Sequence, residues 1–145
     1  MKNQPLLGGI CPAIVSPWDR KERFDADAFT RLASHLYDEG VHGLYVCGLT
    51  DDGYSMSVAD RKEAARQAVK VSRGRGYVIV HVGAQDMRTA RELAEHAVAQ
   101  GAEAVASIPP SNRTHVEALG YYRELSRAAA GTPLRVYHIP PHTHG

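Results

Sequence analysis

The chain has 145 residues, with 17 Lys and Arg against 16 Asp and Glu, and 43% of them are hydrophobic. These values are typical of one globular domain, so we expect residues 1–145 to form a single domain. A formal net charge of +1 without a basic run argues against nucleic-acid binding, and no apolar stretch approaches the ~20 residues of a membrane span. The N-terminus lacks the apolar segment of a signal peptide, and Cys11 and Cys47 lie in apolar runs typical of buried, reduced thiols. We therefore expect a soluble, cytoplasmic protein.

Short apolar runs alternate with longer stretches of helical periodicity along the chain. The runs are bounded by Gly or Pro, which is typical of strands buried on both faces. Ser57 precedes the second helical stretch as a natural N-cap. In chain order we expect a strand at 9–15, a helix at 25–39, a strand at 43–47, a helix at 58–72, a strand at 77–82, a helix at 88–100, a strand at 104–108, a helix at 115–130 and a strand at 134–139.

This alternation predicts right-handed βαβ crossovers and a parallel sheet, and therefore an α/β fold. A small doubly wound sheet and part of a (β/α)8 barrel both fit the order. No G-x-G-x-x-G or G-x-x-x-x-G-K-[ST] motif supports a nucleotide-binding doubly wound sheet, and no cofactor is predicted. A complete barrel typically needs ~250 residues. We expect the N-terminal part of a TIM (β/α)8 barrel, about four βα units plus a fifth strand, truncated so that its C-terminal half is absent.

The polar residues that follow the predicted strands carry a family resemblance. Three segments stand in register: Gly48-Leu49-Thr50-Asp51-Asp52-Gly53, His81-Val82-Gly83-Ala84 and Tyr137-His138-Ile139-Pro140. Together they resemble the dihydrodipicolinate synthase/N-acetylneuraminate lyase family, and the similarity covers essentially the whole chain. The second and third segments resemble the N-acetylneuraminate lyase branch in particular.

The resemblance implies a (β/α)8 barrel of the class I aldolase type, in which a lysine forms a Schiff base with pyruvate or another 2-keto acid. The implied reaction is reversible aldol cleavage to pyruvate and an aldehyde. By resemblance, Tyr137 is the catalytic phenol that relays a proton near the Schiff base. Thr50 binds the substrate carboxylate through its hydroxyl and a backbone N–H, and Gly48 allows that close approach. Relatives are commonly homotetramers, so a homo-oligomer is expected.

Four positions depart from the family pattern and argue against dihydrodipicolinate synthase itself. Leu49 stands where a hydroxyl residue is usual, and Ser111 lies near the place of a relay tyrosine. Asp51 replaces a glycine, which predicts a carboxylate that repels an anionic substrate. His142 lies where the synthase has an arginine for its second substrate.

The family's Schiff-base lysine lies beyond Gly145, at the end of a sixth strand. The lysines of this chain are predicted on the N-terminal arm, a turn and the second helix, and not at a strand end: Lys2, Lys21, Lys62 and Lys70. We therefore expect the chain to be catalytically inactive by itself.

Two alternatives remain open. One is a non-catalytic half-barrel that hides its open edge by pairing with itself or with a full-length relative. The other is a metal-dependent lyase in which Asp51, Asp52, His81 and His138 converge, with His142 and His144 nearby. The same acids and histidines can also be ordinary polar loop residues. We favour this interpretation and predict no metal site. Asp51 and Asp52, as adjacent residues, are expected to diverge rather than to form an acid/base pair.

Overall fold

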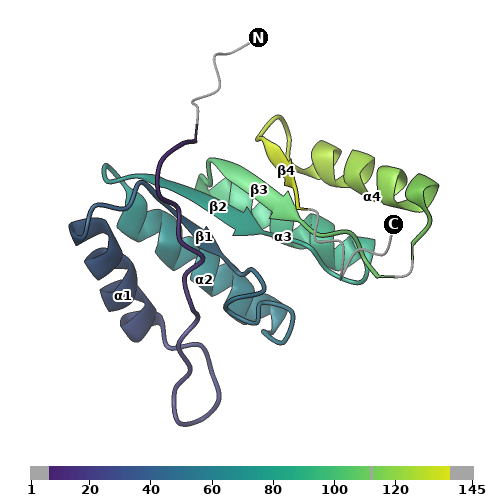
Figure 1. Cartoon of the computed structure of the whole chain (residues 1–145). Helices are drawn as coiled ribbons and strands as arrows, with labels where there is room; N and C mark the ends of the chain where they lie inside the picture. Colours follow the sequence, from purple (N-terminus) through teal and green to yellow (C-terminus); the bar gives the residue numbers. More distant parts are fainter. Residues whose placement is uncertain (1–6, 112, 138–145) are drawn as a thin grey trace.

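A computed structural model of the chain describes residues 7–111 and 113–137. Four strands form one parallel sheet in the order β1-β2-β3-β4 (Figure 1). Neighbours along the chain are neighbours in the sheet, as the predicted crossovers require. The strand bounds are β1 Gly43–Val46, β2 Tyr77–His81, β3 Ala104–Ser107 and β4 Leu134–Val136.

Four helices alternate with these strands, and each begins at a polar N-cap whose side chain accepts a backbone N–H three residues later. The predicted helix over 58–72 is confirmed at both ends, and the other predicted helices differ from the structure by one or two residues at an end. No helix within the described residues has the length and apolar content needed to cross a membrane. The helix bounds are α1 Ala26–Asp38, α2 Val58–Ser72, α3 Met87–Gln100 and α4 His115–Ala128.

The predicted first strand, residues 9–15, is corrected by the structure. This segment runs beside β1 (Figure 1) but forms only an isolated parallel bridge between Ala13 and Tyr45. The Ile14 N–H donates to the Tyr45 carbonyl oxygen at 3.1 Å, and the Tyr45 N–H donates to the Pro12 carbonyl oxygen at 2.9 Å. Pro12 has no N–H of its own, which limits a regular ladder. The last predicted strand is confirmed over β4, and residues 138 and 139 lie outside the described residues.

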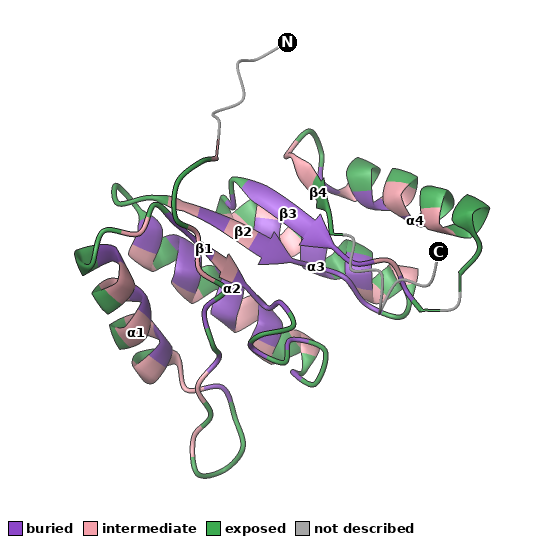
Figure 2. Cartoon of the chain, in the orientation of Figure 1, coloured by how far each residue is buried: buried purple, intermediate pink, exposed green. Residues whose placement is uncertain are grey.

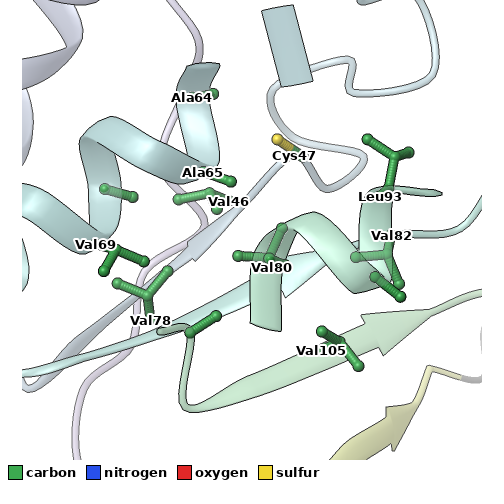
Figure 3. Packing of buried hydrophobic residues seen from close by; sticks show 14 of the residues in the cluster. Val46, Cys47, Ala64, Ala65, Val69, Val78, Val80, Val82, Leu93 and Val105 are labelled. Carbon is green, nitrogen blue, oxygen red and sulfur yellow. The ribbon is translucent and has the colours of Figure 1, made fainter. Parts of the chain in front are cut away.

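The core fills the space between the helices and one face of the sheet. All four residues of β3 are buried, whereas much of α4 faces solvent (Figure 2). Side chains of β1 to β3 meet α2 and α3 in a close-packed layer (Figure 3). Because side chains alternate across a strand, the odd-numbered Tyr45 and His81 face away from this layer. The labelled members of the layer are Val46, Cys47, Ala64, Ala65, Val69, Val78, Val80, Val82, Leu93 and Val105.

Two helix glycines give a matched test of the backbone. Gly101 caps α3 in the left-handed region, with φ 99°, whereas Gly120 lies within α4 with open space around it. We expect Gly101→Ala to lower the free energy of unfolding by about 1 kcal/mol, because a Cβ is strained at that φ. Gly120→Ala is expected to raise it by about 0.5–1 kcal/mol. Urea denaturation of both variants measures the changes, and equal effects would contradict this assignment.

Candidate active site

A cavity of about 300 Å³ opens at the carboxyl ends of the strands, where parallel α/β folds carry their sites. It brings together two of the residues predicted from the sequence, Thr50 and Tyr137, although they are far apart in the chain. Leu49, the departure at the hydroxyl position, also faces it. The full lining is Cys11, Ala13, Tyr45, Leu49, Thr50 and Tyr137.

Tyr45 lies at the back of this cavity and was not predicted as a site residue. Its ring meets the ring of Tyr137 edge to face, with centroids 6.0 Å apart. Its hydroxyl is buried and has no hydrogen-bond partner among the described residues. Burial, followed by the neighbouring Tyr137, raises the pKa of Tyr45 well above its usual value, so the phenol stays protonated. A buried, unpaired hydroxyl therefore belongs to a residue of the cavity lining, next to Tyr137.

Tyr137 follows β4 and is anchored by its backbone. Its N–H donates to the Ser107 carbonyl oxygen at 2.9 Å, which continues the pairing of β4 with β3. The residue is 39% exposed, and its ring contacts that of Tyr45. This arrangement leaves the phenol accessible to a small molecule in the cavity.

Thr50 sits in a tight turn after β1 and is exposed at the cavity mouth. The Asp52 N–H donates to the Leu49 carbonyl oxygen at 3.1 Å and closes the turn. Cys47 and Asp52 are both left-handed, with φ 59° and 53°. Such conformations cost residues with a Cβ about 1–3 kcal/mol each, so neighbouring contacts must hold the turn in place.

Asp51 turns inward from this turn. One of its carboxylate oxygens, Oδ2, accepts the Cys47 N–H at 2.6 Å and the Ser16 hydroxyl at 3.1 Å, while its other oxygen, Oδ1, has no partner among the described residues. Burial raises the pKa of Asp51 to about 6, against the lowering effect of the two hydrogen bonds. Asp51 does not line the cavity, and the expectation that its carboxylate repels a bound anion stays a prediction. Asp52 is exposed, so the two acids diverge as predicted.

Gly48 is buried beside Tyr45 rather than at the cavity surface. A Cβ at this position would lie 2.6 Å from Cε1 of Tyr45, so only glycine leaves room for that ring. The Gly53 N–H donates to the Gly48 carbonyl oxygen at 2.9 Å and secures the end of the turn. Gly48 thus shapes the cavity through Tyr45, and its predicted part in substrate binding stays a prediction.

A buried arginine connects α2 to the end of β2. The Arg61 guanidinium donates to the carbonyl oxygens of Gly83 at 3.0 Å and of His81 at 2.8 Å. It is only 4% exposed. A guanidinium is always charged and costly to bury, and these two hydrogen bonds offset part of that cost, although the Arg61 Nε has no partner among the described residues. Arg61 therefore fixes the loop after β2 against the helix.

His81 is 1% exposed and neutral. Burial, followed by the charge of Arg61, lowers the pKa of His81 to about 3. Its Nε2 accepts the Ile108 N–H at 3.2 Å, so the proton of the neutral ring lies on Nδ1. The Tyr54 ring packs edge-on against it at 5.5 Å between centroids. His81 is thus a packed acceptor and not a proton donor at neutral pH.

No three His, Cys, Asp or Glu side chains lie close enough to hold a metal ion within residues 7–111 and 113–137. Of the proposed ligands, Asp51 is buried and Asp52 is exposed, while His81 uses Nε2 as an acceptor. His138, His142 and His144 lie outside the described residues.

The remaining predicted residues lie apart from the cavity. Ser111 is exposed after β3. Lys62 forms an ion pair with Glu92 between α2 and α3. The other described lysines, Lys21 and Lys70, are exposed, and neither lines the cavity.

Tyr45 and Arg61 support the cavity and its loops but are not among the residues predicted from the sequence. Tyr45 stands in an apolar run typical of core residues, although strand alternation puts it on the face opposite Leu44 and Val46. Arg61 carried a usable signal, since it falls three and seven residues before Ala64 and Ala68 on the buried face of α2. A charged residue on that face indicates a buried structural role.

The neutral state of His81 predicts a pH dependence of stability. The unfolded residue binds a proton near pH 6.5 and the folded one only near pH 3, so stability falls as the pH is lowered through that window. Between pH 7 and pH 5 this contribution falls by about 2 kcal/mol. His81→Gln keeps an acceptor for Ile108 and does not titrate, so the variant should lose correspondingly less. Urea denaturation at both pH values measures the difference, and identical losses would contradict it.

Comparison with known proteins agrees with this architecture. The model of the Dihydrodipicolinate synthetase family matches residues 6–145. N-acetylneuraminate lyase of Mediterraneibacter gnavus is 31% identical over 142 residues, which are 97% of this chain and 45% of that protein. The corresponding lyase of Citrobacter koseri is 30% identical over 139 residues, 92% of this chain and 46% of its own length. The chain therefore spans about half the length of the curated relatives it matches.

Solved structures give the same result. A sialic acid aldolase of Ruminococcus gnavus, a catalytic lysine mutant, superposes with a TM-score of 0.92 at 30% identity over 96% of this chain and 46% of its own. N-acetylneuraminate lyase of Mycoplasma synoviae superposes with a TM-score of 0.87 at 27% identity over 92% of this chain and 47% of its own. The predicted fold class is confirmed, because the chain forms the N-terminal half of a (β/α)8 barrel. Since the family model matches residues 6–145, this chain belongs to the dihydrodipicolinate synthetase family.

Proposed function

We propose that this chain supplies the carboxylate-binding part of a class I aldolase-type site that acts on pyruvate or another 2-keto acid. The reaction is the reversible aldol cleavage of a 2-keto acid to pyruvate and an aldehyde, in the cytoplasm. The observation that carries the proposal is the single cavity lined by Thr50, Tyr45 and Tyr137 at the carboxyl edge of the sheet.

Each lining residue has a chemical role in the proposal. The Thr50 hydroxyl and a backbone N–H of its turn bind the carboxylate, since donors of this kind stabilise a localised negative charge. The Tyr137 phenol relays a proton at the reacting carbon, and its accessible edge suits that task. Leu49 has no hydroxyl to extend the relay, so Tyr137 carries the proton alone.

The Schiff-base lysine is proposed to come from outside this chain. Lys62 is paired with Glu92, and Lys21 and Lys70 are exposed away from the cavity. None of the three is buried in an apolar pocket of the kind that holds a nucleophilic lysine. The chain therefore binds pyruvate reversibly and forms no covalent adduct by itself.

A borohydride trapping experiment tests this proposal. We expect the 145-residue chain, incubated with pyruvate and borohydride, to show an unchanged intact mass. NMR titration with pyruvate should shift the Thr50 amide, and Thr50→Val should weaken binding about tenfold because a charge-assisted hydrogen bond is lost. Thr132→Val is the matched control, because Thr132 precedes β4 and lies at the amino ends of the strands, opposite the cavity.

Two outcomes would contradict the proposal. A reduced pyruvate adduct on one of the chain's lysines would show that it completes its own Schiff-base site. Equal pyruvate affinity for the wild type and Thr50→Val would remove Thr50 from carboxylate binding.

A second candidate is that the half-barrel associates with itself or with a relative, by way of its two edges. The observation that favours it is a set of exposed apolar side chains on the edge segments, Ile10 at 64%, Val15 at 49% and Val136 at 61%. An open parallel edge with apolar side chains promotes pairing with another chain. A homotetramer of the kind expected for relatives is one form of such an assembly.

Light scattering measures this association directly. We expect a mass above that of one chain at high concentration, and Val136→Lys should shift the equilibrium toward the monomer because it places a charge on the β4 edge. Val116→Lys provides the control, since Val116 is 79% exposed on α4, away from the sheet edges. A monomeric wild type at all concentrations would exclude self-association.

A further inference from the structure

We propose that Asp51 is a positioning residue, which holds the turn after β1 so that Thr50 faces the cavity. This inference rests on the proposed function, because Thr50 is given its role there. Asp51 stands where the family resemblance predicts glycine, so the device belongs to this chain and not to the general pattern of the family.

Two backbone hydrogen bonds close the turn that carries Thr50. The Asp52 N–H donates to the Leu49 carbonyl oxygen at 3.1 Å and the Gly53 N–H to the Gly48 carbonyl oxygen at 2.9 Å, while Thr50 itself is exposed. Cys47, where the chain leaves β1, is held in the left-handed region at φ 59°. A cysteine with its Cβ adopts that conformation only when neighbouring contacts compensate for it.

Asp51 supplies the compensating contact. Its Oδ2 accepts the N–H of the strained Cys47 at 2.6 Å, so the carboxylate closes the turn back onto its own start. The same oxygen accepts the Ser16 hydroxyl at 3.1 Å, from the segment that runs beside β1. Asp51 therefore joins the turn to the end of β1 and to the segment that runs beside that strand. Thr50 is its immediate neighbour in the chain and moves with it.

The ionised carboxylate is the stronger acceptor for both donors. The positive charge of Arg61 in α2 favours the ionised form of Asp51. The other titratable groups that face Asp51 are Tyr45 and the Cys47 thiol. Both stay neutral because burial raises their pKa. Burial of Asp51 raises its own pKa to about 6. Near pH 7 the ionised form of Asp51 prevails. Acidification below pH 6 protonates it and weakens its hydrogen bonds to the Cys47 N–H and the Ser16 hydroxyl.

Positioning and repulsion make opposite predictions for a bound anion. If Asp51 acted as a negative charge beside the cavity, its removal would strengthen the binding of pyruvate. If it positions Thr50, removal weakens binding. The inward orientation of the carboxylate, which accepts two hydrogen bonds and does not line the cavity, favours positioning.

Three variants separate these cases. Asp51→Gly installs the family's residue and removes the acceptor, whereas Asp51→Asn is neutral but keeps an amide oxygen for the Cys47 N–H and the Ser16 hydroxyl. Asp52→Asn removes the adjacent, exposed carboxylate and is the matched control; asparagine tolerates the left-handed φ of 53° there. Thermal unfolding of each variant establishes that it is folded before binding is measured.

Pyruvate affinity, followed by NMR at the Thr50 amide, is the main measurement. We expect Asp51→Gly to bind about tenfold more weakly, Asp51→Asn to bind about threefold more weakly because its amide oxygen is a weaker acceptor than a carboxylate, and Asp52→Asn to bind within about twofold of the wild type. Wild-type affinity should fall from pH 7.5 to pH 5, while that of Asp51→Asn stays flat, since pyruvate remains ionised over this range. Tighter binding by Asp51→Gly or Asp51→Asn, or unchanged binding by a folded Asp51→Gly, would overturn the proposal.

A second readout keeps this test separate from the proposed function. Hydrogen exchange of the Cys47 amide and the chemical shifts of Thr50 report the turn without any ligand. We expect both to change in Asp51→Gly and to persist in Asp51→Asn. If the wild type binds no pyruvate, the proposed function fails. The positioning of Thr50 is then decided by these signals alone, and an unperturbed turn in Asp51→Gly would reject it.

Discussion

Right-handed crossovers between neighbouring parallel strands are the constraint on which the rest of this structure depends. They put the helices on one face of the sheet and bring every strand's carboxyl end to one edge. Thr50, after β1, and Tyr137, after β4, consequently meet in one cavity although 86 positions separate them in the sequence. The face of the sheet that the helices cover supplies the close-packed layer that holds these ends in place.

The cavity is shaped less by its polar residues than by what keeps them there. Gly48 leaves room for the Tyr45 ring, and Asp51 holds the turn after β1. Arg61 ties the loop after β2 to α2 through two carbonyl oxygens. Buried polar groups of this kind are costly unless their hydrogen bonds are made, so each restricts its loop to few conformations. The substrate-facing residues thus depend on a supporting set behind them.

Much of the architecture was predictable because its signals are local. Ser57 as an N-cap and the apolar spacing that follows it define α2 at both ends, since capping and periodicity involve residues within a few positions of each other. The segment at 9–15 was predicted as a strand from its composition but forms only one bridge, because Pro12 cannot donate to a ladder. Composition alone does not report which backbone donors are available for pairing.

The order of strands and helices followed from spacing along the chain, and the candidate residues Thr50 and Tyr137 followed from the resemblance of local motifs to a known family. The direction of Asp51, the neutral state of His81 and the place of Tyr45 followed only from the folded arrangement. Burial and hydrogen bonding to distant segments set these properties, as the contact between Asp51 and Ser16 illustrates. Adjacent acids look equivalent in a sequence. The tertiary structure makes one of them a buried acceptor and leaves the other in solvent, because only one carboxylate can reach the donors behind the turn.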